Sequence, residues 1–289
     1  MKPFCSAPNE PRRTLQNFLA AALSPVGRTL YVYGGGWDGT DTGAGTEARS
    51  FGCSPAWERF FAARGPGYDY REPGAGGGFA PLDGKNPYRF AGLDCSGYLG
   101  WALFQVLGRP GGPGFVVSST QLAGWLAERG LGTLERGDGG PVAAARFRPG
   151  DIFSLTGHVW LCLGTCADGS LVIVHSSPTP SRAGFPGGGV QLSALNPGDD
   201  ENPACDAARL ARQAMERLSP VWSSRYPAVL KRFRHYAQPA AHPLSGLFRW
   251  DEAALSDREG YRGKTAEEIL EELWGGPGDG AFHKEERNP

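Results

Sequence analysis

Gly92-Leu93-Asp94-Cys95-Ser96-Gly97-Tyr98-Leu99-Gly100-Trp101-Ala102-Leu103 begins as a small turn and becomes a helix at its cysteine. The apolar residues that follow have the three-and-four spacing of a buried helix face: Leu99, Ala102, Leu103, Val106 and Leu107. This pattern predicts that Cys95 lies at the helix N-terminus, where unpaired amides and the helix dipole favour a thiolate. Because the thiolate is the reactive form of cysteine, Cys95 is a candidate nucleophile. A buried cysteine that only fills a packing gap is the alternative.

Two histidines lie downstream on a pair of strand-like runs. The runs cover residues 157–164 and 170–177, and the Asp168-Gly169 pair between them is a hairpin signal. The register centred on this turn places His158 opposite His175, with their Cβ atoms about 5 Å apart on one face of the sheet. A shift of two residues would make the two histidines diagonal neighbours.

A cysteine at a helix start and two histidines on neighbouring strands are the groups that nucleophilic thiol catalysis requires. One imidazole takes the thiol proton, and a second polar group holds that imidazole in the correct tautomer. The pattern assigns these roles to Cys95 as nucleophile, His158 as base and His175 as orienting group. The alternative is a zinc site, built from His158, Cys162, Cys166 and His175. Four residues along a strand span about 13 Å, too far for ligands of one zinc ion, so we expect no metal and no cofactor.

The composition of the 289-residue chain is that of an ordinary globular protein. Hydrophobic residues make up 40% and charged residues 20%, and the formal net charge of −1 provides no field to attract nucleic acid or an anionic membrane. No apolar run approaches the roughly 20 residues that cross a bilayer. Six scattered cysteines do not have the spacing of a small disulfide scaffold. We therefore expect neither nucleic acid nor a membrane as a partner.

Turn-forming residues and periodic segments divide the chain into parts. Residues 1–12 are interpreted as an irregular arm, and 13–199 as one α+β domain in which the Cys95 helix packs on an antiparallel sheet. Residues 38–91 are rich in glycine and proline, and so long a loop in a compact domain is usually either a functional lid or disordered. Because the stretch also contains several aromatic residues, it is expected to form an ordered insertion that covers or shapes the site. Residues 200–289 are expected to form a helical extension packed on this domain. The helices expected along the chain cover residues 13–23, 55–64, 118–128, 205–218, 221–236 and 265–274.

Six short motifs follow one another between residues 13 and 195. They are Tyr-x-x-Gly-Gly at 31–35, Asp-Cys-Ser-Gly at 94–97, Ser/Thr-x-x-Gln at 118–121, Pro-Gly-Asp at 149–151, Gly-His-Val at 157–159 and a strand ending in His175. In this order they resemble the NlpC family of papain-like cell-wall cysteine peptidases. The resemblance implies a papain-like core with Cys95 as nucleophile, His158 as base and His175 as third group. The insertion 38–91 departs from the family pattern, because it separates the first two motifs.

The resemblance also implies residues that bind the substrate. Tyr31 corresponds to a tyrosine whose hydroxyl lies near the nucleophile in relatives. Asp94 and Ser96 correspond to positions that contact the amine of the substrate peptide and its D-Glu carboxylate. Ser118 is expected to make a further carboxylate contact, for which its neighbour Ser119 competes.

The reaction implied by the resemblance is cleavage of the γ-D-glutamyl to diaminopimelate (or Lys) bond in peptidoglycan stem peptides. The expected partners are therefore stem peptides or muropeptides. An amidase or acyltransferase on the same scaffold, and a non-catalytic peptidoglycan-binding module, are the alternatives. No signal peptide is visible behind residues 1–5, so the expected location stays open between the bacterial cell envelope or secretion, which the family implies, and the cytoplasm.

Overall fold

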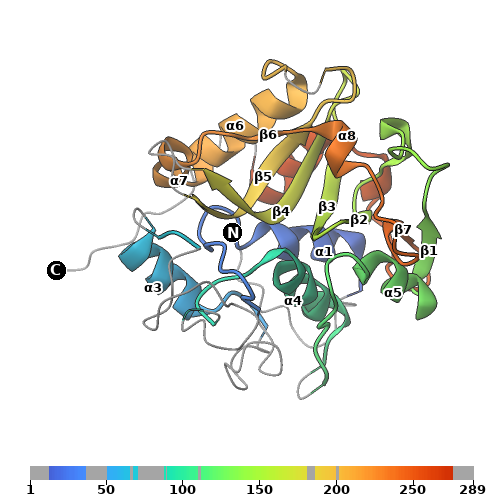
Figure 1. The fold of residues 1–289 in the computed structure, drawn as a ribbon, viewed down its shortest axis with the longest axis horizontal. Coiled ribbons are helices and arrows are strands. Elements are labelled where there is room, and N and C mark those ends of the chain that lie inside the picture. The colour runs from blue at the N-terminus through green and yellow to red at the C-terminus, as the bar shows by residue number, and fades with distance from the viewer. Residues whose placement is uncertain are drawn as a thin grey trace.

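The computed structural model describes residues 13–36, 51–65, 68–70, 88, 90–109, 112–180, 186–199 and 202–275. In this part of the chain, one seven-stranded, mostly antiparallel sheet is flanked by eight α-helices (Figure 1). The predicted α+β class is confirmed. The predicted arm 1–12 and much of the insertion 38–91 lie outside the described residues.

The sheet has the strand order β1-β7-β2-β3-β4-β5-β6, and only β5 and β6 pair in parallel. Its strands are β1 (Gly132–Glu135), β2 (Ile152–Leu155), β3 (His158–Thr165), β4 (Leu171–Pro180), β5 (Pro186–Leu195), β6 (Leu230–Lys231) and β7 (Gly246–Trp250). The four strands β2 to β5 are consecutive in the chain and adjacent in the sheet. This meander brings the start of β3 and the second half of β4 to the same end of the sheet.

The helices are α1 (Leu15–Leu23), α3 (Pro55–Arg64), α4 (Cys95–Leu107), α5 (Leu122–Glu128), α6 (Asp206–Leu218), α7 (Pro220–Arg225), α8 (Phe233–Tyr236) and α9 (Ala266–Trp274), with 3-10 turns at Ala144–Arg146 and Tyr261–Gly263. Four of them begin at a side chain that accepts a hydrogen bond from the first turn: Thr14, Ser54, Asp94 and Thr265. Such a cap stabilises a helix by about 1 kcal/mol. The caps explain why these four helices start within two residues of the predicted positions.

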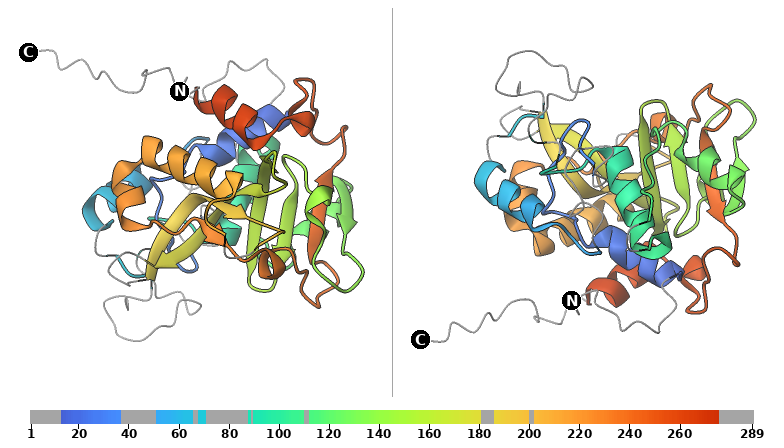
Figure 2. Two further views of the ribbon diagram at one scale, coloured as in Figure 1. Left: turned by 90° about the horizontal axis from the view of Figure 1, so that it is seen from above. Right: turned by 90° about the horizontal axis from the view of Figure 1, so that it is seen from below.

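Hydrophobic side chains pack on both sides of the sheet. On one side, alternate residues of β3, β4 and β5 join a large core with α1, α4, α6 and α9. On the other side, Phe153, Trp160 and Ile173 form a smaller cluster with Phe147 and Phe233. Figure 2 shows α1 and α9 side by side, so the first and last described helices lie together in the fold.

Residues 200–289 are not the purely helical extension that the sequence predicts. They contribute β6 at the edge of the sheet, and β7 lies between β1 and β2. The five residues of β7, Gly-Leu-Phe-Arg-Trp, are too short and too weakly alternating to be distinguished from a loop by their pattern alone. The C-terminal segment is therefore part of the sheet and not only a layer packed on it.

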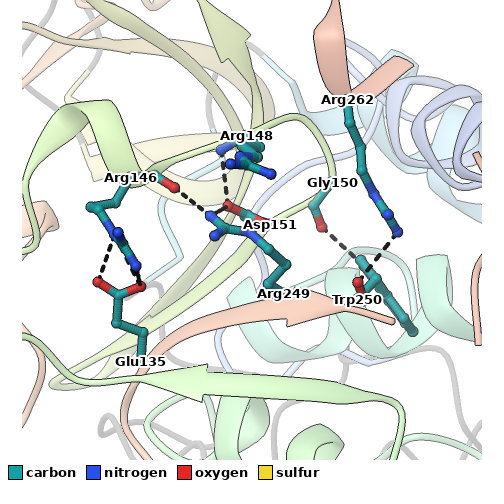
Figure 3. Close-up of polar contacts among 8 residues, drawn as sticks. All are labelled: Glu135, Arg146, Arg148, Gly150, Asp151, Arg249, Trp250 and Arg262. Atoms are coloured by element: carbon teal, nitrogen blue, oxygen red, sulfur yellow. Dashed lines mark hydrogen bonds and ion pairs between the residues drawn. The ribbon is translucent and has the colours of Figure 1, made fainter. Parts of the chain in front are cut away.

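Arg249 joins β7 to the turn that precedes β2 (Figure 3). Its guanidinium donates to both carboxylate oxygens of Asp151, at 3.2 and 2.6 Å, and to the Arg146 carbonyl. The neighbouring Trp250 donates from Nε1 to the Gly150 carbonyl at 3.0 Å. The Pro-Gly-Asp turn thus connects the C-terminal strand to the hairpin that carries His158.

Candidate active site

Cys95 is the first residue of α4, as the sequence predicts. Asp94 caps the helix, and its carboxylate accepts hydrogen bonds from the Gly97 amide at 2.7 Å and from the Ser96 hydroxyl at 3.0 Å. The two residues for which the resemblance implies substrate contacts, Asp94 and Ser96, therefore bond to each other beside the thiol. Their capping bonds orient the first turn of the helix around Cys95.

Glycines allow the segment 30–36 to lie directly against the start of α4. The Asp94 amide donates to the Gly35 carbonyl at 2.8 Å. A Cβ atom on Gly97 would overlap with the same carbonyl, so a side chain at this position would force the two segments apart. The close approach places Tyr31 within electrostatic reach of the nucleophile.

The Cys95 thiol lies against the backbone on both sides of His158. It donates to the Gly157 carbonyl, with an Sγ–O distance of 3.9 Å. The Val159 amide and the Ser119 hydroxyl are hydrogen-bond donors toward the sulfur. Because Gly157 and Val159 flank His158, these contacts bring the predicted nucleophile to the strand end that carries the predicted base.

The two predicted histidines form a direct hydrogen bond. Nε2 of His158 lies 2.8 Å from Nδ1 of His175, and the two ring centroids are 5.0 Å apart. His175 is fully buried, whereas His158 at the start of β3 is half-buried. The sequence thus predicts correctly that the two side chains meet, and His158 is the more exposed of the two.

The register between β3 and β4 differs by two residues from the predicted one. The hairpin closes on the pair Thr165–Leu171, and an irregularity between Cys162 and Gly164 shifts the register by one residue, so His158 and His175 are diagonal neighbours and not opposite each other. In the turn, the Asp168 carboxylate accepts a bond from the first amide of α6, at 2.7 Å. Local sequence could not reveal this long-range contact.

A third polar group extends the hydrogen-bonded pair into the sheet. Nε2 of His175 lies 2.9 Å from Oγ of Ser193, a fully buried residue of β5. If His158 is to accept a proton at Nδ1, its own proton must sit on Nε2 and point toward His175. His175 then carries its proton on Nε2 and donates to Ser193. The sequence predicts no role for Ser193, since a serine inside a strand carries no distinguishing pattern.

Burial disfavours the charged form of both the predicted nucleophile and the predicted base. Burial, with a smaller contribution from the Asp94 carboxylate, raises the pKa of the Cys95 thiol to about 12. Burial and the charge of Lys231 lower the pKa of His158 to about 3. The thiolate predicted from the helix N-terminus is therefore wrong for the resting site, because a dipole contribution of about 0.3–1 kcal/mol does not offset desolvation.

The raised pKa predicts how alkylation of Cys95 depends on pH. We expect the rate with iodoacetamide to be well below that of a free thiol at pH 7, because the thiolate fraction falls tenfold for each unit by which the pKa is raised. The rate should still increase between pH 9 and pH 10. Peptide mass spectrometry of Cys95 measures this rate separately from the other cysteines. A plateau reached below the free-thiol pKa of about 8.5 would contradict the prediction.

Three of the four predicted substrate contacts surround the nucleophile, and the fourth does not. Tyr31 is buried, and its ring meets that of Tyr70 edge-on, with a centroid distance of 5.3 Å. Burial raises the pKa of the Tyr31 phenol, with smaller contributions from Cys95 and Asp94. Ser118 is exposed, and its carbonyl accepts a hydrogen bond from the Gln121 amide at the start of α5, at 2.9 Å. Its neighbour Ser119 is the residue that bonds to the sulfur.

Tyr236 of α8 covers the two histidines. Its ring meets those of His158 and His175 edge-on, with centroid distances of 5.4 and 5.8 Å. Its carbonyl accepts a hydrogen bond from Trp160 Nε1 at 2.9 Å, and burial raises the pKa of its phenol to about 12 despite a hydrogen bond with Ser177. The sequence predicts no role for Tyr236, because it lies beyond the motifs and in a segment interpreted as packing helix.

The residues of the alternative zinc site have other environments. His158 and His175 bond to each other, and Cys162 is fully buried in the smaller hydrophobic cluster. Across the described ranges, no group of three or more His, Cys, Asp or Glu side chains is arranged to hold a metal ion. In the same ranges, no helix has the length and apolar character required to cross a membrane.

Comparisons of the chain with protein-family models, with curated proteins and with solved structures found no match. Function is therefore inferred from the residues and their geometry, together with the order of the motifs.

Proposed function

We propose that this protein is a cysteine peptidase that hydrolyses the γ-D-glutamyl to diaminopimelate (or Lys) bond of peptidoglycan stem peptides. The observation that carries the proposal is the bonded pair His158–His175 beside the Cys95 thiol. If Cys95 only filled space in the core, the thiol and the two imidazoles would have no reason to lie together, whereas thiol catalysis requires all three groups at one place. The substrate class rests on the order of the motifs and their resemblance to the NlpC family.

The proposed reaction begins with a neutral thiol and a neutral imidazole. As the sulfur of Cys95 attacks the γ-carbonyl carbon of D-Glu, its proton moves to Nδ1 of His158, the nitrogen that does not bond to His175. The protonated His158 then gives this proton to the leaving amine, and a thioester remains on Cys95. Water, deprotonated by His158, hydrolyses the thioester and restores the thiol.

The first turn of α4 is suited to stabilise the tetrahedral intermediate. The first four amides of a helix have no partner within it, and they point toward charge that develops at the N-terminus. The amide of Cys95 belongs to this turn, while Asp94 occupies the Gly97 amide. We therefore assign oxyanion stabilisation to the Cys95 amide.

Incubation with purified muropeptides tests the proposed function. Mass spectrometry should show release of the fragment ending in γ-D-Glu, and the Cys95→Ala variant should release none above background. Cys53→Ala is the matched control, because Cys53 is also a free cysteine but bonds to Ser24, away from the site. A product pattern that is the same for the wild-type protein and Cys95→Ala would refute the proposal.

A further inference from the structure

Lys231 places a positive charge on the same face of the sheet as the catalytic histidines. It lies in β6, where Leu195 of β5 is its Cα partner. Alternate residues of a strand point to one face, so Lys231 shares a face with Ser193 and Gln191. Gln191 in turn is the partner of His175 in β4. The cation and the catalytic pair thus share one face of the sheet.

The ammonium group of Lys231 has a hydroxyl as its partner and no carboxylate among the residues that the structure describes. Nζ donates to Thr179 Oγ1 at 3.2 Å, and the same oxygen accepts a bond from Gln191 Nε2 at 2.7 Å. Two donors therefore occupy the two lone pairs of this hydroxyl. An ammonium has three donors and no acceptor, so Lys231 retains capacity for an anionic ligand.

A half-buried ammonium without a counter-ion is costly. Burial lowers the pKa of Lys231 to about 8, yet the group is still mostly protonated at pH 7. Its charge also lowers the pKa of both His158 and His175, which shows that it lies within electrostatic reach of them. A cation held in this position weakens the catalytic base by lowering its pKa. An anionic group of a substrate, bound to Lys231, would offset this effect.

We propose that Lys231 binds a carboxylate of the substrate and is a specificity-determining residue of the site. This inference rests on the proposed peptidase function. Two candidate carboxylates flank the bond when the third residue is linked onward through its own α-carboxyl: the α-carboxylate of D-Glu on the acyl side, and the additional carboxylate of diaminopimelate on the leaving-group side, which lysine lacks. If the second is the ligand, Lys231 selects diaminopimelate-containing stem peptides over lysine-containing ones.

Three synthetic stem peptides, each with the α-carboxyl of its third residue amidated, distinguish these sources: L-Ala-γ-D-Glu-diaminopimelate, the same peptide with L-Lys in the third position, and the first peptide with the α-carboxylate of D-Glu also amidated. We expect Lys231→Met to raise KM about tenfold for peptides that carry the bound carboxylate and to leave the peptide that lacks it unchanged. Lys231→Arg should restore most of the loss. Lys264→Met, which removes a lysine next to α9, is the control. An equal loss for all three peptides would overturn the inference.

A second measurement separates failure of this inference from failure of the proposed function. At pH 7, Cys95 is alkylated with iodoacetate, which is anionic, and with iodoacetamide, which is neutral and of similar size. We expect the ratio of the two rates to fall at least about threefold in Lys231→Met, since the attraction for the anion is lost. If no peptide is cleaved but the ratio falls, the peptidase assignment fails and the anion site stands. An unchanged ratio refutes the anion site.

Discussion

Replacing His158 with alanine is expected to lower kcat for stem-peptide cleavage by about 10² to 10⁴-fold, the usual contribution of a positioned base. The effect is large because burial raises the pKa of Cys95 to about 12, so the thiol cannot supply its own thiolate at neutral pH. Release of the γ-D-Glu fragment at pH 7.5, followed by mass spectrometry, measures the loss. Full activity in a folded His158→Ala variant would exclude His158 as the base.

Graded variants of His175 test whether the hydrogen-bonded pair orients the base. His175→Ala removes the acceptor for His158 Nε2, whereas His175→Asn keeps an amide oxygen that can accept the same bond. We therefore expect activity to decrease in the order wild type, His175→Asn, His175→Ala, His158→Ala. Ser193→Ala should have the smallest effect on activity, because Ser193 bonds to His175 and not to His158. If the alanine and asparagine variants lose activity equally, the bond to His158 is not what matters.

Replacing Asp151 with alanine is expected to destabilise the fold by about 3 kcal/mol, at the lower end of the range for broken buried ion pairs. Asp151 is 2% exposed, and its carboxylate accepts from the Arg148 amide as well as from Arg249 (Figure 3). Burial raises the pKa of this carboxyl although Arg249 opposes the shift, so the pair gains little over its desolvation cost. The loss arises mainly because the charge of Arg249, with 24% of its side chain exposed, is left without a carboxylate and keeps only the Arg146 carbonyl as an acceptor. Urea unfolding measures the change.

The pair Arg146–Glu135 provides a matched control in the same region. It is also a bidentate arginine–carboxylate contact, but its side chains are 56% and 34% exposed. Exposed pairs contribute about 0–1 kcal/mol, so Glu135→Ala should cost less than 1 kcal/mol. A double variant, Asp151→Ala with Arg249→Leu, should be more stable than the sum of the single changes predicts. Equal losses for Asp151→Ala and Glu135→Ala would contradict this account.

The elements that local sequence predicts well are those with their own start signals. α4 begins at Cys95 because Asp94 caps it, and α9 follows the capping box of Thr265 and Glu268. The runs that become β3 and β4 alternate between two buried faces, so their existence follows from apolar content alone. The nucleophile and both histidines belong to these elements, which is why the three candidate residues could be chosen before their geometry was known.

The parts that the sequence does not predict depend on contacts between distant segments. The turn of the histidine hairpin is bonded to the start of α6, whose first amide donates to Asp168, and Tyr236 reaches the site from a part of the chain outside the motifs. The protonation state of Cys95 depends on how completely other segments bury it, and spacing along the chain contains no measure of burial. Ser119 and not Ser118 bonds to the sulfur. Both residues are serines, and the sequence does not indicate which of two neighbouring side chains points toward Cys95.

The position of β7 has a consequence for how this protein is made. The central meander and α4 are complete once residue 195 has been synthesised, but β1 and β2 lack the strand that lies between them until residues 246–250 leave the ribosome. Until then, both strands expose unpaired backbone edges to the solvent, and such edges promote association between chains. Closing this gap requires contacts between residues that are 92 to 118 positions apart in the chain, which slows folding. The nascent protein therefore covers these edges only when the last third of the chain has been synthesised. A fragment that ends after β5 would keep the edges of β1 and β2 unpaired.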